Sequence, residues 1–161
     1  MTVRIRPEPI VSSVAGALIA ALNAELSALY PESGATHFRL DPEEVAPGRG
    51  AFVVAEREGE AVGCGAVRLL DAGTAELKRM YVAPAARGLG VGRALVDALE
   101  QEALRLGARR LVLETGIRQH AALALYRNAG YVAIPLYGEY VHSPGTSICL
   151  GKAVPGGGDE P

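Results

Sequence analysis

Residues 87–93 read RGLGVGR, with three glycines in five positions and an arginine at each end. The run before them, TAELKRMYVAP over 74–84, predicts a strand that ends at a proline, and the run after them has apolar residues at helical spacing up to residue 106. The first N–H groups of a helix lack intrahelical acceptors, and the helix dipole adds positive charge there. We therefore expect an anion at this turn, most naturally a diphosphate, with both arginines donating charge-assisted hydrogen bonds.

Other interpretations of this turn are judged on the same residues. A Walker A loop needs a Gly-Lys-Ser/Thr ending, which is missing, and a dinucleotide fingerprint needs a third glycine where Arg93 stands. The glycines could also form a purely structural turn that packs a helix against a strand. From these residues alone, this interpretation and a phosphate site are equally supported. The glycines alone therefore leave the ligand undecided.

Composition limits the class of protein. The 161 residues, nearly half of them apolar, suffice for one core, so we expect one domain over 1–152 and a disordered tail over 153–161. The net charge of −2 and the few aromatic residues argue against nucleic acid as a partner. The apolar stretch 14–22 is shorter than the roughly 20 residues of a membrane span, so we expect no membrane partner, no export signal and a cytoplasmic location.

The two cysteines, Cys64 and Cys149, form no Cys-x-x-Cys pair and no cluster with histidine. This pattern predicts two buried thiols and no metal site.

The rest of the chain alternates strand and helix signals. Helices are predicted from Ser12 or Ser13 to about Tyr30 and over 119–130, with a short helical candidate after Asp41-Pro42. Further strands are predicted at 3–7, 51–58, 61–70, 109–115, 131–136 and 146–152. The order β-α-β-β-β-α-β-α-β-β predicts an α+β fold around a central, mostly antiparallel sheet.

The pattern Arg-x-x-Gly-x-Gly, which follows a strand and opens a helix, resembles the acyl-CoA binding motif of the GNAT family, the Gcn5-related N-acetyltransferases. The likeness extends to AELKRMYVAPAARGLGVGRALVDALE over 75–100 and RLVLETGIRQHAALALYRNAGYV over 110–132. It implies a small, single-domain member of bacterial type, with a mixed sheet whose parallel fourth and fifth strands splay apart and helices on its faces. The resemblance also allows a homodimer, built through the last strands or a sheet edge.

The resemblance implies acetyl-CoA as the acetyl donor, and the sequence itself contains no metal motif. The pantetheine arm of acetyl-CoA would pair with backbone of 80–82 in the splay, and its pyrophosphate would lie on the N–H groups of 87–93. Gln119 stands where the family often has asparagine. The cofactor-binding residues so implied are Met80, Tyr81, Val82, Arg87, Gly88, Leu89, Gly90, Val91, Gly92, Arg93 and Gln119.

Two residues match catalytic positions of the family. Tyr126, in ALYRNAGY, would protonate the departing thiolate, and Glu76 would act as the general base that deprotonates the amine. From the residues alone, Tyr126 can also be a core tyrosine on an apolar helix face. Glu76 can instead be a strand glutamate that pairs with Lys78 on the same face.

The acceptor side is implied to come from the N-terminal helix region and the last hairpin. The substrate-binding residues expected there are Tyr30, Arg39, Arg79 and Tyr137. Arg39, Arg79 and Arg118 could bind a substrate carboxylate, whereas Glu25, Glu32 and Glu139 could attract a polyamine.

The resemblance implies an N-acetyltransferase that passes the acetyl group from acetyl-CoA to a primary amine of a small molecule, by direct attack in a ternary complex. No arrangement typical of a covalent nucleophile is visible. A protein or peptide acceptor is the alternative within the class, and a non-catalytic acyl-CoA sensor is the alternative outside it.

Overall fold

The computed structural model describes residues 2–31 and 40–154. Within these ranges seven strands form one mixed sheet in the order β1-β2-β3-β4-β5-β7-β6. The strands are β1 (Val3–Pro7), β2 (Gly50–Arg57), β3 (Glu60–Leu69), β4 (Thr74–Val82), β5 (Arg110–Gly116), β6 (Val132–Ile134) and β7 (Ser147–Ala153). The α-helices are α1 (Ser13–Leu29), α2 (Val91–Arg105) and α3 (His120–Asn128), and the short 3-10 helices are η1 (Pro42–Val45), η2 (Pro84–Ala86) and η3 (Gly138–His142). The predicted order of strands and α-helices is confirmed.

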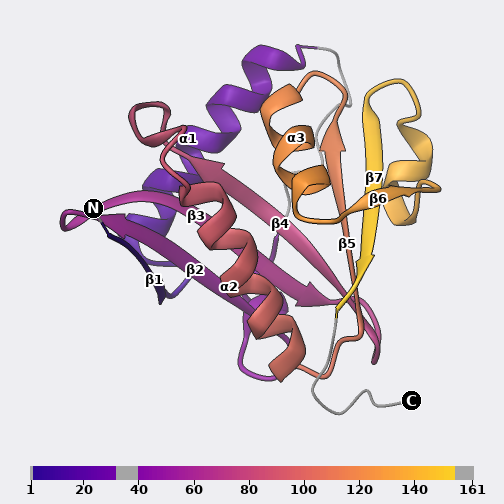
Figure 1. Ribbon diagram of the computed structural model, residues 1–161, viewed down its shortest axis with the longest axis horizontal. Helices are drawn as coiled ribbons and strands as arrows, with labels where there is room; N and C mark the ends of the chain where they lie inside the picture. Colours follow the sequence, from indigo (N-terminus) through magenta and orange to yellow (C-terminus); the bar gives the residue numbers. More distant parts are fainter. Residues whose placement is uncertain (1, 32–39, 155–161) are drawn as a thin grey trace.

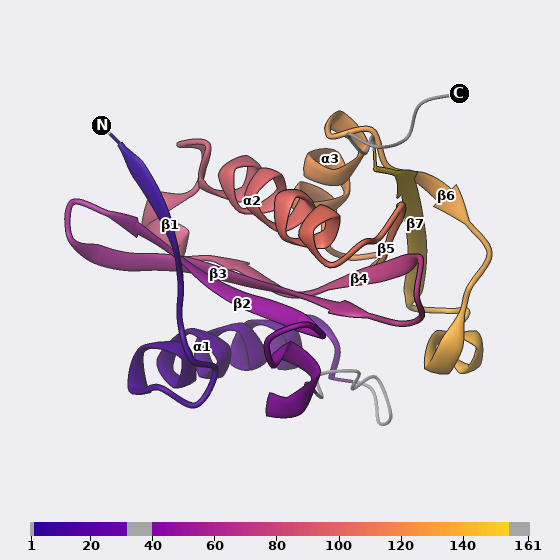
Figure 2. The ribbon, with the colours of Figure 1, turned by 90° about the horizontal axis from the view of Figure 1, so that it is seen from below.

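The sheet separates two layers of helices (Figures 1 and 2). Helices α2 and α3 cover one face, and α1, η1 and η3 lie on the other. The larger core packs α2 and α3 on alternate strand residues such as Leu77, Leu111 and Leu113. The smaller core packs α1 on the opposite face, through Phe52 and Val54. This alternation is the period-2 pattern of strands buried on both faces.

Local signals fix where the helices begin and end. The Ser12 side chain caps α1 by accepting the N–H of Ala15 at 3.0 Å. Helix α2 begins after Gly90, at φ +85°, and ends before Gly107, at φ +90°. Both φ values lie in the left-handed region that glycine adopts without steric cost, so the two glycines delimit this helix as predicted.

The parallel strands β4 and β5 are paired only at their beginnings. The register runs from Thr74 opposite Arg110 to Leu77 opposite Leu113, and no pair is formed beyond it within the described strands. On its other side β4 carries a bulge, because the register with β3 shifts between Cys64 and Ala66. The expected splay of the fourth and fifth strands is therefore present from Lys78 onward.

The end of the chain is more ordered than expected. Strand β7 continues to Ala153, and Val154 is buried, with its N–H donating to the carbonyl of Arg109 at 2.8 Å. The fold thus runs to residue 154, two residues past the predicted boundary at 152. Residues 155–161 of the predicted tail lie outside the described residues.

Candidate functional site

A cavity of about 550 Å³ opens at the end of β4, between the N-termini of α2 and α3. Every residue predicted to bind the cofactor lines it except Leu89, which is half exposed instead. The predicted residues that line it are Met80, Tyr81, Val82, Arg87, Gly88, Gly90, Val91, Gly92, Arg93 and Gln119. The structure therefore brings the local motif and the more distant Gln119 to one cavity, which we call the donor cavity.

The glycines of this loop serve two different purposes. Gly88 and Gly90 have φ values of +79° and +85°, so the turn into α2 requires the left-handed conformation at both. A Cβ built on Gly92 would instead lie 3.0 Å from the Leu125 side chain, so Gly92 lets α2 approach α3 closely. Two of the glycines therefore shape the turn into α2, and the third packs α2 against α3; an anion at this turn stays a prediction.

Both loop arginines already have partners. Arg87 donates from Nη2 to Glu25 of α1 at 2.6 Å and from Nε to the carbonyl of Val82 at 2.9 Å. Arg93 pairs along α2 with Asp97 at 3.1 Å. These ion pairs are solvent-exposed and therefore weak, so a phosphate would compete with them at small cost.

A second, smaller cavity of about 100 Å³ lies between the splayed ends of β4 and β5, beside α1. Of the residues predicted to bind the acceptor, Tyr30 and Arg79 line it. Tyr137 does not line this cavity, and Arg39 lies outside the described residues. Tyr140 of η3 also lines this cavity. We call this the acceptor cavity.

The two cavities meet at three shared residues, Met80, Gln119 and Tyr126. Tyr126 projects from α3 and is 5% exposed. Burial, together with the nearby Glu114 carboxylate, raises the pKa of Tyr126 well above its usual value, so its hydroxyl stays protonated at neutral pH. Gln119 is held by its Oε1, which accepts the N–H of Gly116 at 2.9 Å. The junction therefore carries a protonated, buried hydroxyl.

Tyr30 is positioned by the loop after β5. Its hydroxyl accepts the N–H of Arg118 at 2.8 Å, and the Arg118 guanidinium lies over its ring at 5.0 Å. A Cβ on Gly116 would lie 1.7 Å from the Tyr30 hydroxyl, so this site needs a glycine. Arg118 thus holds Tyr30 and lines the donor cavity, not the acceptor cavity.

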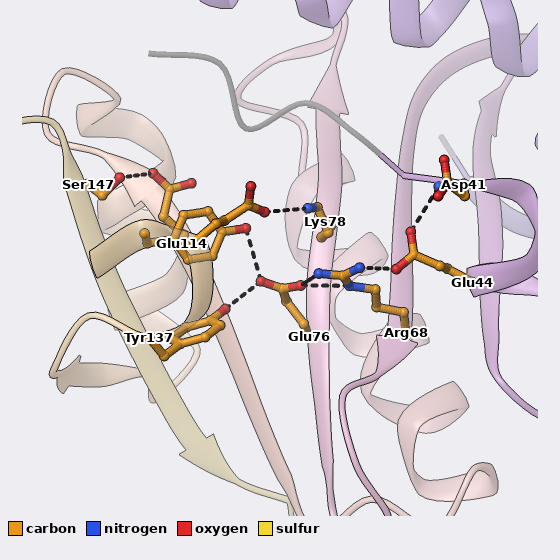
Figure 3. Close-up of polar contacts among 10 residues, drawn as sticks. Asp41, Glu44, Arg68, Glu76, Lys78, Glu114, Tyr137 and Ser147 are labelled. Carbon is orange, nitrogen blue, oxygen red and sulfur yellow. Dashed lines mark hydrogen bonds and ion pairs between the residues drawn. The ribbon is translucent and has the colours of Figure 1, made fainter. Parts of the chain in front are cut away.

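Glu76 lies in a closed network (Figure 3) and is not part of the lining of either cavity. It is fully buried. One carboxylate oxygen binds Arg68 at 2.8 Å, and the other accepts the hydroxyls of Tyr137 at 2.6 Å and Tyr140 at 3.0 Å. Arg68 in turn pairs with Glu44 of η1.

This network supplies the partners of Glu76 and does not test its predicted role as a general base, which stays a prediction. Its position favours the structural alternative, with Arg68 as its partner in place of Lys78. Burial and the Glu76 carboxylate raise the pKa of both tyrosines, which therefore remain donors at neutral pH. By accepting the hydroxyl of Tyr140, Glu76 holds η3 and therefore positions a residue that lines the acceptor cavity.

The polar residues of the acceptor cavity that were not predicted include Lys78 on β4, Glu114 on β5 and Ser147 on β7. Ser147 donates to Glu114 at 2.7 Å. Lys78 and Glu114 each directly follow the last paired residues, Leu77 and Leu113. Strand alternation puts them on the α1 face, but only the register shows that they flank the same gap.

Other side chains give no sign of separate chemistry. Cys64 and Cys149 are both buried as free thiols, and burial raises the pKa of Cys64 to about 12. Over residues 2–31 and 40–154, no three side chains of the His, Cys, Asp and Glu types gather as a metal site would require. In the same part of the chain, no helix has the length and apolar character needed to cross a membrane.

Comparison with known proteins identifies this architecture. A model of the acetyltransferase (GNAT) family matches residues 17–131. An IAA acetyltransferase of Azospirillum brasilense is 40% identical over 128 residues, which are 79% of this chain and 82% of that protein.

Solved structures agree. One from Klebsiella pneumoniae, named as an acyl-CoA N-acyltransferase, has a TM-score of 0.80 and 34% identity over 95% of this chain and 98% of that one. An acetyl-CoA-bound GNAT acetyltransferase from Elizabethkingia anophelis has the same fold, with a TM-score of 0.67 and 19% identity over 94% of this chain and 97% of that one. The chain therefore belongs to the GNAT family and is an acetyltransferase.

Proposed function

We propose that the protein transfers the acetyl group of acetyl-CoA to a primary amine of a small molecule, by direct attack in a ternary complex. The observation that carries this proposal is the meeting of two cavities at the buried hydroxyl of Tyr126. A donor and an acceptor that enter from opposite faces of the sheet would react at that point. Both reactants would be bound together, as direct transfer requires.

The donor cavity suits acetyl-CoA in three respects. The N-terminus of α2 lines this cavity at the turn of Gly88 and Gly90, and the free N–H groups of a helix N-terminus favour an anion such as a diphosphate. The edge of β4 over 80–82 is not paired with β5, so its backbone groups are available to an extended amide chain such as pantetheine. Arg87 and Arg93 add positive charge beside the turn.

Tyr126 would supply the proton for the leaving group. As the amine nitrogen bonds to the acetyl carbon, the C–S bond breaks and the hydroxyl proton passes to sulfur. The proton that the amine loses after attack then restores the phenol. A backbone N–H of β4, that of Tyr81, would stabilise the oxyanion.

The sizes of the cavities favour a small acceptor. The acceptor cavity, about 100 Å³, is less than a fifth of the donor cavity, about 550 Å³. Typical sites for small molecules are a few hundred Å³ or more, so an extended peptide fits this one poorly.

The test is release of free thiol from acetyl-CoA by the purified protein, with a panel of small primary amines beside peptides that carry a free N-terminus or lysine. We expect turnover of small amines with kcat/KM at least 10-fold above that of any peptide. Preferred turnover of peptides would support the protein acceptor instead. Tight binding of acetyl-CoA with no turnover of any amine or peptide would support the sensor.

A further inference from the structure

Lys78 is a buried cation that the proposed reaction does not use. Its side chain is 5% exposed, and it lines the acceptor cavity from the first position beyond the β4–β5 pairing. Over the described residues, its Nζ is the only buried side-chain nitrogen or oxygen without a hydrogen-bond partner. Buried polar groups in folded proteins almost always have a hydrogen-bond partner, so we expect this ammonium to bind an acceptor from a ligand.

The contacts around Lys78 do not supply that ligand. Its ion pair with Glu139 of η3 spans 3.8 Å, too long for a hydrogen bond, and the Glu139 side chain is half exposed. The neighbouring Arg79 is engaged with the side chain of Asn23 on α1. Lys78 is therefore the cation of this cavity that is best placed to bind an incoming anion.

A carboxylate stands on the opposite strand. Glu114 lines the same cavity from β5, one step beyond its last paired residue, as Lys78 does on β4 (Figure 3). Tyr126 lines the same cavity, so this carboxylate shares it with the hydroxyl that would protonate the leaving group. A positively charged amine is attracted to this carboxylate and repelled by the Lys78 ammonium.

We propose that the acceptor is an amino acid, whose carboxylate binds Lys78 and whose amine binds Glu114 beside Tyr126. This inference rests on the proposed function and names the acceptor class for the same site. A polyamine is disfavoured, because its second cation would meet Lys78 and Arg79. The opposite charges on the two strands would also fix the direction in which the acceptor enters.

The experiment measures thiol release with the free amino acids and with the carboxamide of each. The paired compounds carry the same amine, and only the first has a carboxylate. We expect at least one amino acid to be acetylated, with its amide at least 10-fold lower in kcat/KM. Lys78→Met should raise the KM for that amino acid about 10- to 100-fold, the range for losing a hydrogen bond to a charged group, and leave the amide unchanged.

Two further variants separate binding from folding. Lys152→Met removes the chain's other lysine, which pairs with Glu100 away from both cavities, and should keep the preference for the acid over the amide. Glu114→Gln should lower kcat/KM for the acid and the amide alike, because both carry the amine. In thermal melts, the amino acid should stabilise the wild type and Lys152→Met, but not Lys78→Met.

The outcomes distinguish this inference from the proposed function. Equal turnover of acids and amides, or an unchanged preference in folded Lys78→Met, would overturn the amino acid assignment and leave acetyl transfer to small amines intact. Turnover of other amines but of no amino acid would do the same. Absence of acetyl-CoA binding would overturn the proposed function as well.

Discussion

Replacing Glu76 with glutamine distinguishes a structural carboxylate from a general base. The substitution keeps the shape of the side chain but removes the charge that pairs with the partly buried Arg68 and accepts two tyrosine hydroxyls. Breaking a buried ion pair costs about 3–5 kcal/mol. Arg68 keeps its second partner Glu44 and is one-fifth exposed, so we expect a loss near the lower end, about 3 kcal/mol.

This loss corresponds to a decrease in Tm of roughly 6–12 °C for a chain of this size. The assay is urea and thermal unfolding followed by circular dichroism, with kcat measured at 25 °C on the folded protein. Glu100→Gln is the matched control, since Glu100 also accepts from a tyrosine, Tyr131, and a cation, Lys152, at a distance from both cavities. Wild-type stability of Glu76→Gln combined with a 100-fold lower kcat would refute this reasoning and support Glu76 as the base.

Three further predictions follow from the donor cavity and the buried hydroxyls. Gly90→Ala should weaken acetyl-CoA binding in calorimetric titration and lower stability by about 1–2 kcal/mol, because φ is +85° there; Gly107→Ala, at φ +90° beyond the other end of α2, should lose similar stability but bind normally. Tyr126→Phe should lower kcat at least about 100-fold and change the Kd for acetyl-CoA less than twofold, whereas Tyr131→Phe, which lines neither cavity, should keep its kcat; equal kcat values would remove the acid role. The raised pKa of about 12 for Cys64 and the raised pKa of Tyr126 favour the neutral groups in the folded state, so their contribution to stability is complete below about pH 9 and is lost as pH rises towards 12; a Tm that stays constant to pH 11 would contradict this.

The fold could be predicted because its signals are local. Alternating apolar residues, the Ser12 cap and glycines 90 and 107 each act within a few positions of the chain. The donor half of the site could be predicted for the same reason, because the turn at 87–93 and the strand before it are adjacent in the sequence. Leu89 differs from its neighbours, because it is half exposed and does not line the cavity; the predicted contact through its backbone N–H stays a prediction.

The acceptor half depends on contacts between distant parts of the sequence. The partners of Glu76 come from β3 and from the segment around η3, which lies more than 60 residues further along the chain. No pattern near Glu76 indicates that they meet. Lys78 and Glu114 could have been paired only with the exact β4–β5 register, which depends on how the whole sheet assembles.

The central claim is that the cavity at RGLGVGR binds acetyl-CoA. Calorimetric titration of the purified protein with acetyl-CoA, and with ATP and NAD as controls, tests it most directly. The account predicts selective binding of acetyl-CoA with a Kd near 1 μM, about −8 kcal/mol, and no measurable binding of the two nucleotides. Absence of acetyl-CoA binding, or equal binding of ATP or NAD, would contradict it.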